Sequence, residues 1–366
     1  MSDTQSLRPG GRILKRVVAI AGMAVLVASM AACTPRGGGS GGPASSGASG
    51  DSGAKVTNIA VVTPATESDH GWNQQGLAAA KATASALNLT LMTDTNVGYD
   101  NTQTILTQVA KKDNQLVIAW ASGFTTAAAR AASATGVPIL VVDNPSAAIP
   151  GKVGVVTFDA QQGAYLAGIA AAMTTKSKTV GVVVSADDIN WFNMSGGFIQ
   201  GVRSVDPSIK IVMAYIGAAS YDDSAGGKKV ANQVIAAGAD VVFGMGDGST
   251  VGYIAAVESA PHPVKYIADI GDVTDLLKDP STMLTSVRWN MEGSFTAAVK
   301  AVEDGSFGKD PFTLTLANGG LSLQDTPNLT PEIKAAVDKA KKGIIDGSIT
   351  VETSTTKAAV TALLNK

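Results

Sequence analysis

The sequence predicts an α/β protein with two doubly wound parallel sheets that flank a ligand cleft. From Val56 onward, short β-branched runs alternate with Ala-rich amphipathic stretches. Such alternation is typical of parallel strands joined by right-handed helical crossovers. The chain has 366 residues, enough for two lobes of roughly 120–150 residues each. Ligands of open α/β sheets bind beyond the carboxyl ends of the strands, so two facing sheets predict a cleft between lobes.

The predicted strands fall into two series. The first comprises 58–63, 90–94, 116–120, 139–143 and 153–158, with helices that begin near Trp72, Asn101, Thr125 and Gln162. The second comprises 179–185, 210–215, 241–245, 265–269 and 283–287, with helices that begin near Ser195, Ser224, Val251 and Gly293. Each series is long enough to build one sheet.

After the second series of strands, we expect the chain to cross back between the two lobes. We expect an extended segment over Leu314–Leu323, a helix over Pro331–Ile345 opened by Thr330, and a last strand over 347–351. The approximate lobe boundaries are then 55–160 with 289–322 for the N-terminal lobe, and 161–288 with 323–366 for the C-terminal lobe.

The N-terminus is typical of a bacterial lipoprotein precursor. Basic residues precede the apolar run Val17–Met30, which is too short to cross a bilayer permanently, and the run ends at Met30-Ala31-Ala32-Cys33. Small residues before a cysteine match the lipobox, where the signal peptide (1–32) is removed and the thiol receives diacylglycerol. An ordinary signal peptide with an incidental thiol is the alternative. Because Cys33 is the only cysteine, an intramolecular disulfide is excluded.

These features predict an extracytoplasmic protein anchored to the cell membrane through a lipid on Cys33. Residues 33–54, which are rich in Gly, Ser, Ala and Pro, predict a flexible linker because they cannot bury a core. We expect the body that follows to be a monomer.

Charge and motifs exclude several function classes. The net charge is −2 and the first 32 residues carry +3, so the remainder carries −5 and offers no footprint for nucleic acid. No GxGxxG fingerprint follows the first strand, and the sequence has no P-loop, GxSxG elbow or His/Cys cluster. We therefore expect neither an enzyme nor a bound cofactor or metal.

Candidate ligand-binding residues lie in the loops that follow the predicted strands. They are Asp69, Trp72, Asn73, Ser122, Phe124, Asp143, Trp191, Gly246, Asp247, Asp269 and Trp289. All four tryptophans (72, 120, 191 and 289) fall within or beside such loops. Aromatic rings with a few directed polar groups suit a small planar ligand or a sugar, although loop aromatics also plug sheet ends. We interpret the adjacent Asp222 and Asp223 as a helix cap.

Several motifs, in this order, resemble one protein family. They are Asp69-x-x-Trp72-Asn73, Gln162–Gly168 (QGAYLAG), Gly196–Gly201 (GGFIQG), Ala236–Val241 (AAGADV) and Leu284–Val287 (LTSV). The chain resembles the basic membrane protein / purine-nucleoside-receptor family of ABC-transporter substrate-binding lipoproteins. The resemblance implies the bilobal type I periplasmic-binding fold, a small-molecule ligand, and ABC permease subunits as partners.

The resemblance also implies roles for individual residues. Trp72 matches the aromatic that stacks on a nucleoside base, and Asp69 and Asn73 match the groups that bond the base or ribose. Asp269 matches an aspartate that holds the ribose hydroxyls, whereas Trp289 stands where many nucleoside receptors have a lysine. As cleft residues, Trp72 and Asp69 are expected to add little to stability. A sugar receptor and a sensor for a membrane signalling protein are the alternatives, and a surface hydrolase is disfavoured.

Overall fold

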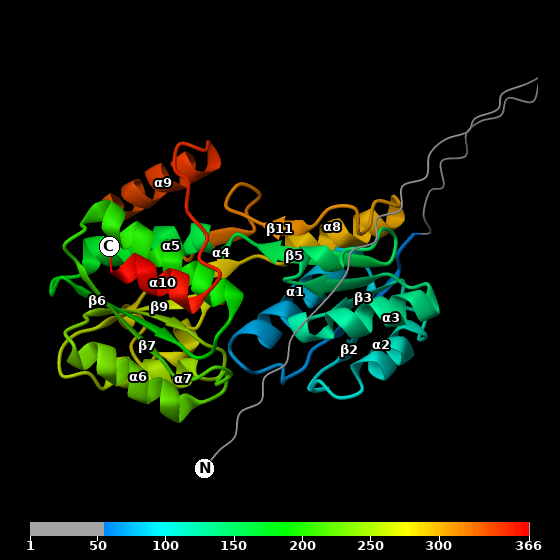
Figure 1. Cartoon of the computed structure of the whole chain (residues 1–366), viewed down its shortest axis with the longest axis horizontal. Helices are drawn as coiled ribbons and strands as arrows, with labels where there is room; N and C mark the ends of the chain where they lie inside the picture. Colours follow the sequence, from blue (N-terminus) through cyan, green and yellow to red (C-terminus); the bar gives the residue numbers. More distant parts are fainter. Residues whose placement is uncertain (1–54, 366) are drawn as a thin grey trace, which may run out of the picture. The chain divides into compact units, whose positions relative to one another are not determined.

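The computed structural model describes residues 55–365, and their strands form two six-stranded sheets. The first sheet has the order β11-β5-β4-β3-β1-β2 and is parallel throughout (Figure 1). The second has the order β12-β10-β9-β8-β6-β7, and only the β10–β12 pair is antiparallel. The predicted pair of doubly wound, mostly parallel sheets is confirmed.

The first sheet contains β1 (Asn58–Val62), β2 (Thr90–Asp94), β3 (Leu116–Ala119), β4 (Ile139–Val142), β5 (Val153–Phe158) and β11 (Phe312–Leu314). It is covered by α1 (Trp72–Leu87), α2 (Thr102–Ala110), α3 (Thr125–Thr135) and α8 (Glu292–Glu303). Successive residues of β1 point to opposite faces, as the strand geometry requires. Ile59 and Val61 pack in the core that contains α1 and α8, while Ala60 and Val62 pack in the core that contains α2 and α3.

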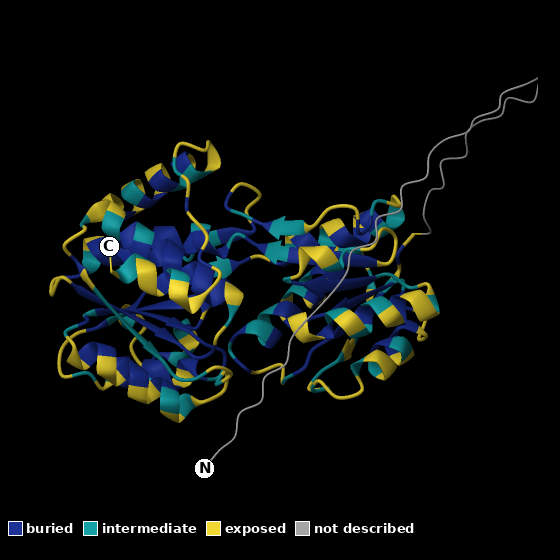
Figure 2. Cartoon of the chain, viewed as in Figure 1, coloured by how far each residue is buried: buried dark blue, intermediate teal, exposed yellow. Residues whose placement is uncertain are grey.

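The second sheet contains β6 (Thr179–Val184), β7 (Lys210–Tyr215), β8 (Val241–Met245), β9 (Lys265–Ile270), β10 (Met283–Trp289) and β12 (Leu321–Leu323). Its helices are α4 (Ala160–Thr174), α5 (Ile189–Val205), α6 (Ser224–Ala236), α7 (Thr250–Glu258), α9 (Pro331–Ile345) and α10 (Lys357–Leu364). The edge strands β2 and β7 are only partly covered, whereas the inner strands of both sheets are largely buried between their helix layers (Figure 2). Burial on both faces explains why these strands read as nearly continuous apolar runs.

Close packing of α4 on α5 explains the glycines of two of the sequence motifs. A Cβ on Gly168 would lie 2.3 Å from the carbonyl oxygen of Phe198, and one on Gly201 would lie 2.1 Å from that of Tyr165. Backbone atoms cannot move aside as a flexible side chain can, so these positions require glycine while the helices remain in contact.

The chain passes between the sheets three times, and hydrogen bonds join the crossing segments. After β5, the backbone N–H of Asp159 donates to the Leu314 carbonyl (3.0 Å), and after β10 that of Asn290 donates to the Gly320 carbonyl (2.8 Å). The side chain of Gln162, from the QGAYLAG motif, accepts the N–H of Leu316 at 3.0 Å. The crossings therefore form one bonded hinge between the two sheets.

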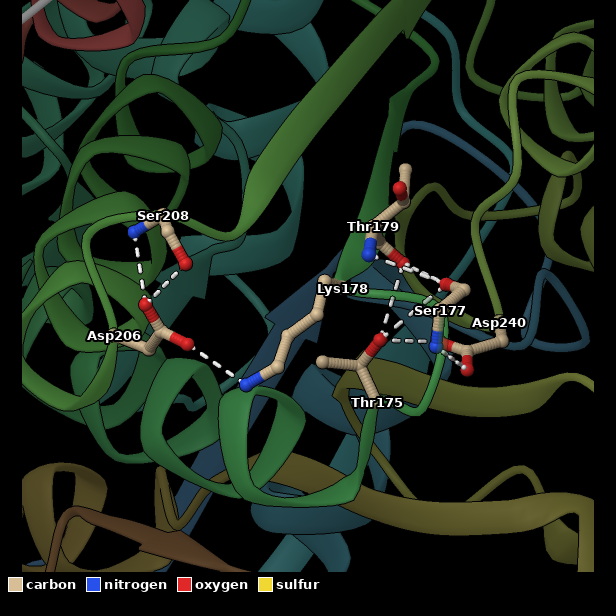
Figure 3. A network of polar contacts seen from close by, with 7 residues as sticks. All are labelled: Thr175, Ser177, Lys178, Thr179, Asp206, Ser208 and Asp240. Carbon is tan, nitrogen blue, oxygen red and sulfur yellow. Dashed lines mark hydrogen bonds and ion pairs between the residues drawn. The ribbon is translucent and has the colours of Figure 1, made fainter.

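A separate polar network fastens the loop between α4 and β6 at the amino end of the second sheet (Figure 3). Asp240 accepts hydrogen bonds from the Thr175 hydroxyl (2.5 Å) and from the backbone N–H groups of Lys176 and Ser177 (2.7 and 2.8 Å). These bonds keep the pKa of Asp240 below its ordinary value. Ligand sites of parallel sheets lie at the other end of the strands, so this network is structural.

Two local predictions were wrong. Helix α5 begins at Ile189 and not near Ser195, because Asp188 accepts the N–H groups of Asn190 and Trp191 and so caps the helix six residues earlier. Residues 347–351 form no strand, since the Ile349 N–H bonds back to the Gly343 carbonyl and no sheet edge receives the segment.

The other local predictions tested by the structure hold or need a small change. Thr330 caps α9 and Asp223 caps α6, as predicted, whereas the side chain of Asp222, which was predicted to share that cap, accepts no hydrogen bond from the helix. Only the ends of the predicted extended segment Leu314–Leu323 are strand: β11 ends at Leu314, β12 covers Leu321–Leu323 in the other sheet, and residues 315–320 turn between them as the chain changes lobe. In the described part of the chain, no helix is both long and apolar enough to cross a bilayer.

Candidate functional site

A cavity of about 200 Å³ lies at the carboxyl ends of strands from both sheets. The first lobe contributes Pro64, Ala65, Asp69, Trp72, Asn73, Tyr99, Ala121, Ser122 and Asp143 to its wall. The second contributes Asp188, Asn190, Trp191, Tyr221, Asp222, Asp247 and Ile270, and Trp289 at the end of β10 completes it. This is the position where open α/β sheets bind ligands.

Most of the residues suggested by the sequence meet at this cavity, and three do not. Phe124, Gly246 and Asp269 are outside the wall. Phe124 is fully buried in the core under α2 and α3, and Gly246 packs against the Tyr253 ring. Asp269 is also buried and accepts the indole N–H of Trp191 at 2.9 Å, so it positions a cavity residue without reaching the cavity.

Five further aromatic, acidic or amide residues of the wall were not among the candidates from sequence: Tyr99, Asp188, Asn190, Tyr221 and Asp222, the last of which was interpreted as part of a helix cap. Tyr99 follows β2 and Tyr221 follows β7, the edge strands whose loops were not considered. Applying the carboxyl-end rule to every strand would have found both tyrosines. Asp188 and Asn190 were read as part of a loop, and only the early start of α5 brings them to the cavity.

Trp72 forms part of an aromatic cluster at the base of the cavity. Its ring stacks on Trp120 with centroids 4.4 Å apart and planes inclined by 13°. Each indole N–H donates to the backbone carbonyl of the other residue, at 3.1 Å from Trp72 and 3.0 Å from Trp120. Phe158 and Trp289 meet the Trp72 ring edge-on, at 5.6 and 6.2 Å. One face of Trp72 is therefore covered by protein, which leaves at most its other face for a ligand.

Asp69 organises the first turn of α1. Its carboxylate accepts the backbone N–H groups of Gly71, Asn73 and Gln74 at 3.1, 2.9 and 2.9 Å. It also accepts the side-chain amide of Asn73 at 2.7 Å. A carboxylate in this position satisfies donors that the start of a helix leaves unpaired. Much of the bonding capacity of Asp69 is thus used within its own loop.

Two hydrogen bonds cross the cleft in opposite directions. Asp247 of the second lobe accepts the backbone N–H of Trp72 at 2.9 Å. Asp143 of the first lobe accepts the side-chain amide of Asn190 at 2.8 Å. Each lobe therefore supplies one carboxylate that accepts a hydrogen bond from the other lobe.

Burial raises the pKa values of three carboxylates in or beside the cavity, those of Asp143, Asp247 and Asp269. It raises the pKa of Asp143 to about 7, with the charge of Asp188 adding to the effect and the Asn190 hydrogen bond opposing it. It raises the pKa of Asp247 well above its ordinary value, and nearby Asp69 raises it further. The pKa of Asp269 rises to about 8 for the same reason. Clusters of strongly shifted groups in a cleft are typical of functional sites.

The cavity wall contains backbone strain and unpaired polar groups. Ile270 has φ +62°, a conformation that is rare for a β-branched residue and costs free energy. The indole N–H of Trp289 and the side-chain carbonyl of Asn73 are enclosed without a hydrogen-bond partner among residues 55–365. Such features destabilise a fold and persist mainly where function requires them.

The chemistry of the wall suits recognition of a flat, polar small molecule. Aromatic rings supply apolar contact area and carboxylates supply hydrogen-bond acceptors. Within the described residues, His, Cys, Asp and Glu side chains form no group of three or more that could hold a metal ion.

Residues 56–355 match the family described as "ABC transporter substrate-binding protein PnrA-like". Among curated relatives, the ABC transporter nucleoside-binding protein BmpA of Lactococcus lactis is 34% identical over 211 residues, which are 53% of this chain and 59% of that relative. Basic membrane protein D of Borreliella burgdorferi is 23% identical over 82% of this chain and 89% of that protein. The first of these alignments thus spans less than two thirds of the relative's length.

Solved structures share the fold at low sequence identity. A solute-binding protein of an ABC transporter system from Aeropyrum pernix superimposes with a TM-score of 0.71, at 19% identity, over 84% of this chain and 96% of that one. One from Conexibacter woesei gives 0.70 at 17% identity, over 82% and 99%. The family match covers most of the described residues and agrees with the motifs around Asp69 and Gln162. This chain therefore belongs to the family of PnrA-like ABC transporter substrate-binding proteins.

Proposed function

We propose that this protein is the extracytoplasmic receptor of an ABC importer and that it captures a purine nucleoside between its two lobes. The wall of aromatic rings and carboxylates, contributed by both lobes at the carboxyl ends of their strands, carries the proposal. A nucleoside offers a flat base for the rings and hydroxyl and N–H donors for the carboxylates. The nucleoside-binding relative from Lactococcus lactis supports the same ligand class.

Capture would work by closure of the lobes. A ligand shifts the equilibrium toward the closed state only if it makes contacts there that the open state lacks. A base seated against Trp72 and Trp191 would contact both lobes at once, because these residues belong to different sheets. The closed receptor would then deliver the ligand to the permease subunits, without altering it chemically.

The anchoring part of the proposal rests on sequence. Cys33 and the signal peptide lie outside the described residues, 55–365. The lipobox at Met30–Cys33 supports a lipid anchor on the outer face of the cell membrane, and the linker 33–54 supports a body held off that surface.

The ligand is best identified from the protein itself. Small molecules extracted from protein purified under native conditions are analysed by mass spectrometry, and calorimetric titrations then compare inosine, guanosine and adenosine with D-arabinose and D-glucose. We expect a nucleoside in the extract and nucleoside binding with a change in tryptophan fluorescence. A sugar in the extract together with binding of sugars alone would contradict the nucleoside proposal. Release of free base during incubation would contradict the receptor proposal.

A further inference from the structure

The titratable side chains of the cavity wall are uniformly acidic. Five aspartates line it, namely Asp69, Asp143, Asp188, Asp222 and Asp247, and none of the lining residues is Lys, Arg or His. A ligand with a phosphate would enter an enclosed acidic space without a counter-charge. Low polarity makes such like-charge contact more costly than it is in water.

Helix N-termini offer no substitute for a cationic side chain here. Helices α1 and α5 both begin at the cavity, and free N–H groups at such ends often hold phosphate. The first-turn donors are instead occupied by aspartates. Asp69 and Asp247 accept those of α1, and Asp188 accepts those of Asn190 and Trp191 in α5. The carboxylates of the protein therefore already accept the hydrogen bonds that the helix ends would otherwise donate to an anionic ligand.

One carboxylate oxygen on each side of the cavity remains available. Asp143 and Asp247 each accept a single hydrogen bond, on Oδ1, and the second oxygen of each has no partner among the described residues. Neither second oxygen belongs to the enclosed atoms that lack a partner, so both remain accessible from the cavity. A ligand would thus meet a free acceptor from each lobe.

Aromatic faces stand next to these acceptors. Trp191 and Tyr221 lie with ring centroids 5.4 Å apart in the second lobe, and Trp72 and Tyr99 line the first-lobe side. The face of an aromatic ring attracts a cation, and most strongly so when water is excluded. Carboxylates from both lobes, aromatic faces in the same wall and the lack of basic residues among the lining residues together favour a positively charged ligand.

We propose that this site selects its ligand by charge. It binds a nucleoside-like ligand with a positively charged ring system more tightly than the neutral counterpart of that ligand, and it rejects a phosphorylated one. The nucleoside part of this inference rests on the proposed function, whereas the charge preference rests on the cavity wall alone. Buried carboxylates without a counter-charge disfavour their own ionised form, and a bound cation would restore it.

Two pairs of compounds that are similar in size and shape but differ in charge separate the two effects. The first is 1-methyladenosine, which is protonated at neutral pH, against neutral N6-methyladenosine. The second is 1-methylquinolinium, a permanent cation, against neutral 2-methylquinoline. Calorimetric titration at pH 7.5 should show the cationic member of each pair binding about 10-fold more tightly, and adenosine 5′-monophosphate binding at least 10-fold more weakly than adenosine.

Variants test whether the two free carboxylates cause the preference. Asp143→Asn and Asp247→Asn keep the size and the acceptor oxygen, and each should reduce the cationic advantage several-fold. Exposed Asp310→Asn, which changes the net charge equally outside the cavity wall, should leave it intact. Melting temperatures of all three variants report whether the fold is retained. If one cavity variant does not fold, the other alone tests whether a cavity carboxylate causes the preference.

The outcomes distinguish the inference from the proposed function. Tight binding of neutral nucleosides with no cationic advantage in either pair overturns the charge inference and leaves the nucleoside receptor intact. If no nucleoside binds but 1-methylquinolinium still binds more tightly than 2-methylquinoline, the nucleoside proposal fails and the charge inference stands. An advantage that survives in both cavity variants overturns the inference, because its stated cause is then absent.

Discussion

The carboxylate of Asp247, in the second lobe, accepts the backbone N–H of Trp72, the first residue of α1 in the first lobe, at 2.9 Å. Gly71 occupies the N-cap position of that helix and has no side chain to cap it. The helix is therefore capped in part from the opposite lobe. A Cβ on Gly71 would lie 2.1 Å from Asp247 Oδ1 and 2.9 Å from its Cα, so the contact between lobes requires glycine.

Gly71→Ala should therefore prevent the lobes from reaching this contact. We expect ligand affinity to fall at least 10-fold while the melting temperature of the ligand-free protein changes little, because Gly71 lies outside the hydrophobic core clusters. Calorimetry and thermal melts measure the two effects, and small-angle scattering should show a more open form. Gly293→Ala is the matched control, since a Cβ there has no atom within 4 Å. Equal affinities in the two variants would contradict a role for Gly71 in closure.

Asp69 supports the fold as well as the cavity wall. Four hydrogen bonds converge on its carboxylate, so Asp69→Ala should lower the free energy of unfolding by about 2 kcal/mol. The expectation from sequence, that a cleft residue adds little stability, is revised by this geometry. Asp69→Asn keeps one acceptor oxygen and should recover part of the loss. Urea denaturation followed by circular dichroism checks it, and an unchanged midpoint in Asp69→Ala would contradict it.

Trp72→Ala should reduce both stability and affinity. Loss of the stack on Trp120 and of the indole hydrogen bond from Trp72 to the Trp120 carbonyl should lower the free energy of unfolding by about 2–3 kcal/mol. Loss of its free face should weaken base binding by about 1–3 kcal/mol. Trp72→Phe keeps a ring and should restore most of the affinity but less of the stability. Affinity unchanged in Trp72→Ala, measured by calorimetry, would remove Trp72 from the ligand contacts.

Ionisation of Asp143 should make the ligand-free protein less stable as the pH rises. Its pKa is 3.8 ordinarily and about 7 in the fold. Near pH 3 the carboxyl is protonated in both states. Between about pH 4 and pH 7 the unfolded state loses the proton first, so the free energy of unfolding falls and then stays low.

Asp143→Asn should remove this dependence. Asparagine tolerates the φ of +70° at this position and can still accept the Asn190 amide. We expect the variant to exceed the parent protein in stability by at least about 1 kcal/mol at pH 8, with a difference that shrinks toward pH 4. Urea titrations at several pH values measure it. A difference independent of pH would mean that the Asp143 pKa is not raised.

Cys33→Ala should release the protein from the membrane. With no thiol after the apolar run, no diacylglycerol can be attached, and a short signal peptide alone does not anchor a mature chain. Fractionation of cells, with detection by antibody, should move the protein from the membrane to the soluble fraction. Retention of Cys33→Ala in the membrane fraction would rule out a lipid anchor at this residue.

Local sequence patterns predicted the two sheets, because each buried parallel strand needs an apolar run of its own and each crossover needs an amphipathic helix. It also located Trp72, Asp143, Asp247 and Trp289 near a site, because parallel strands place the loops after their carboxyl ends at one edge. Each of these patterns lies within one short segment, so it can be recognised without knowing which other segments pack against it.

The roles of those residues follow from contacts that form only in the folded chain. Asp69 and Asp188 could equally cap helices or meet a ligand, and the hydrogen bonds assign them mainly to caps. Asp269 was placed in the site by resemblance, but the fold turns it toward the indole of Trp191. The contact between Asp247 and Trp72 joins residues 175 positions apart. No local pattern encodes such a pairing, since it depends on how the two lobes meet in the folded chain.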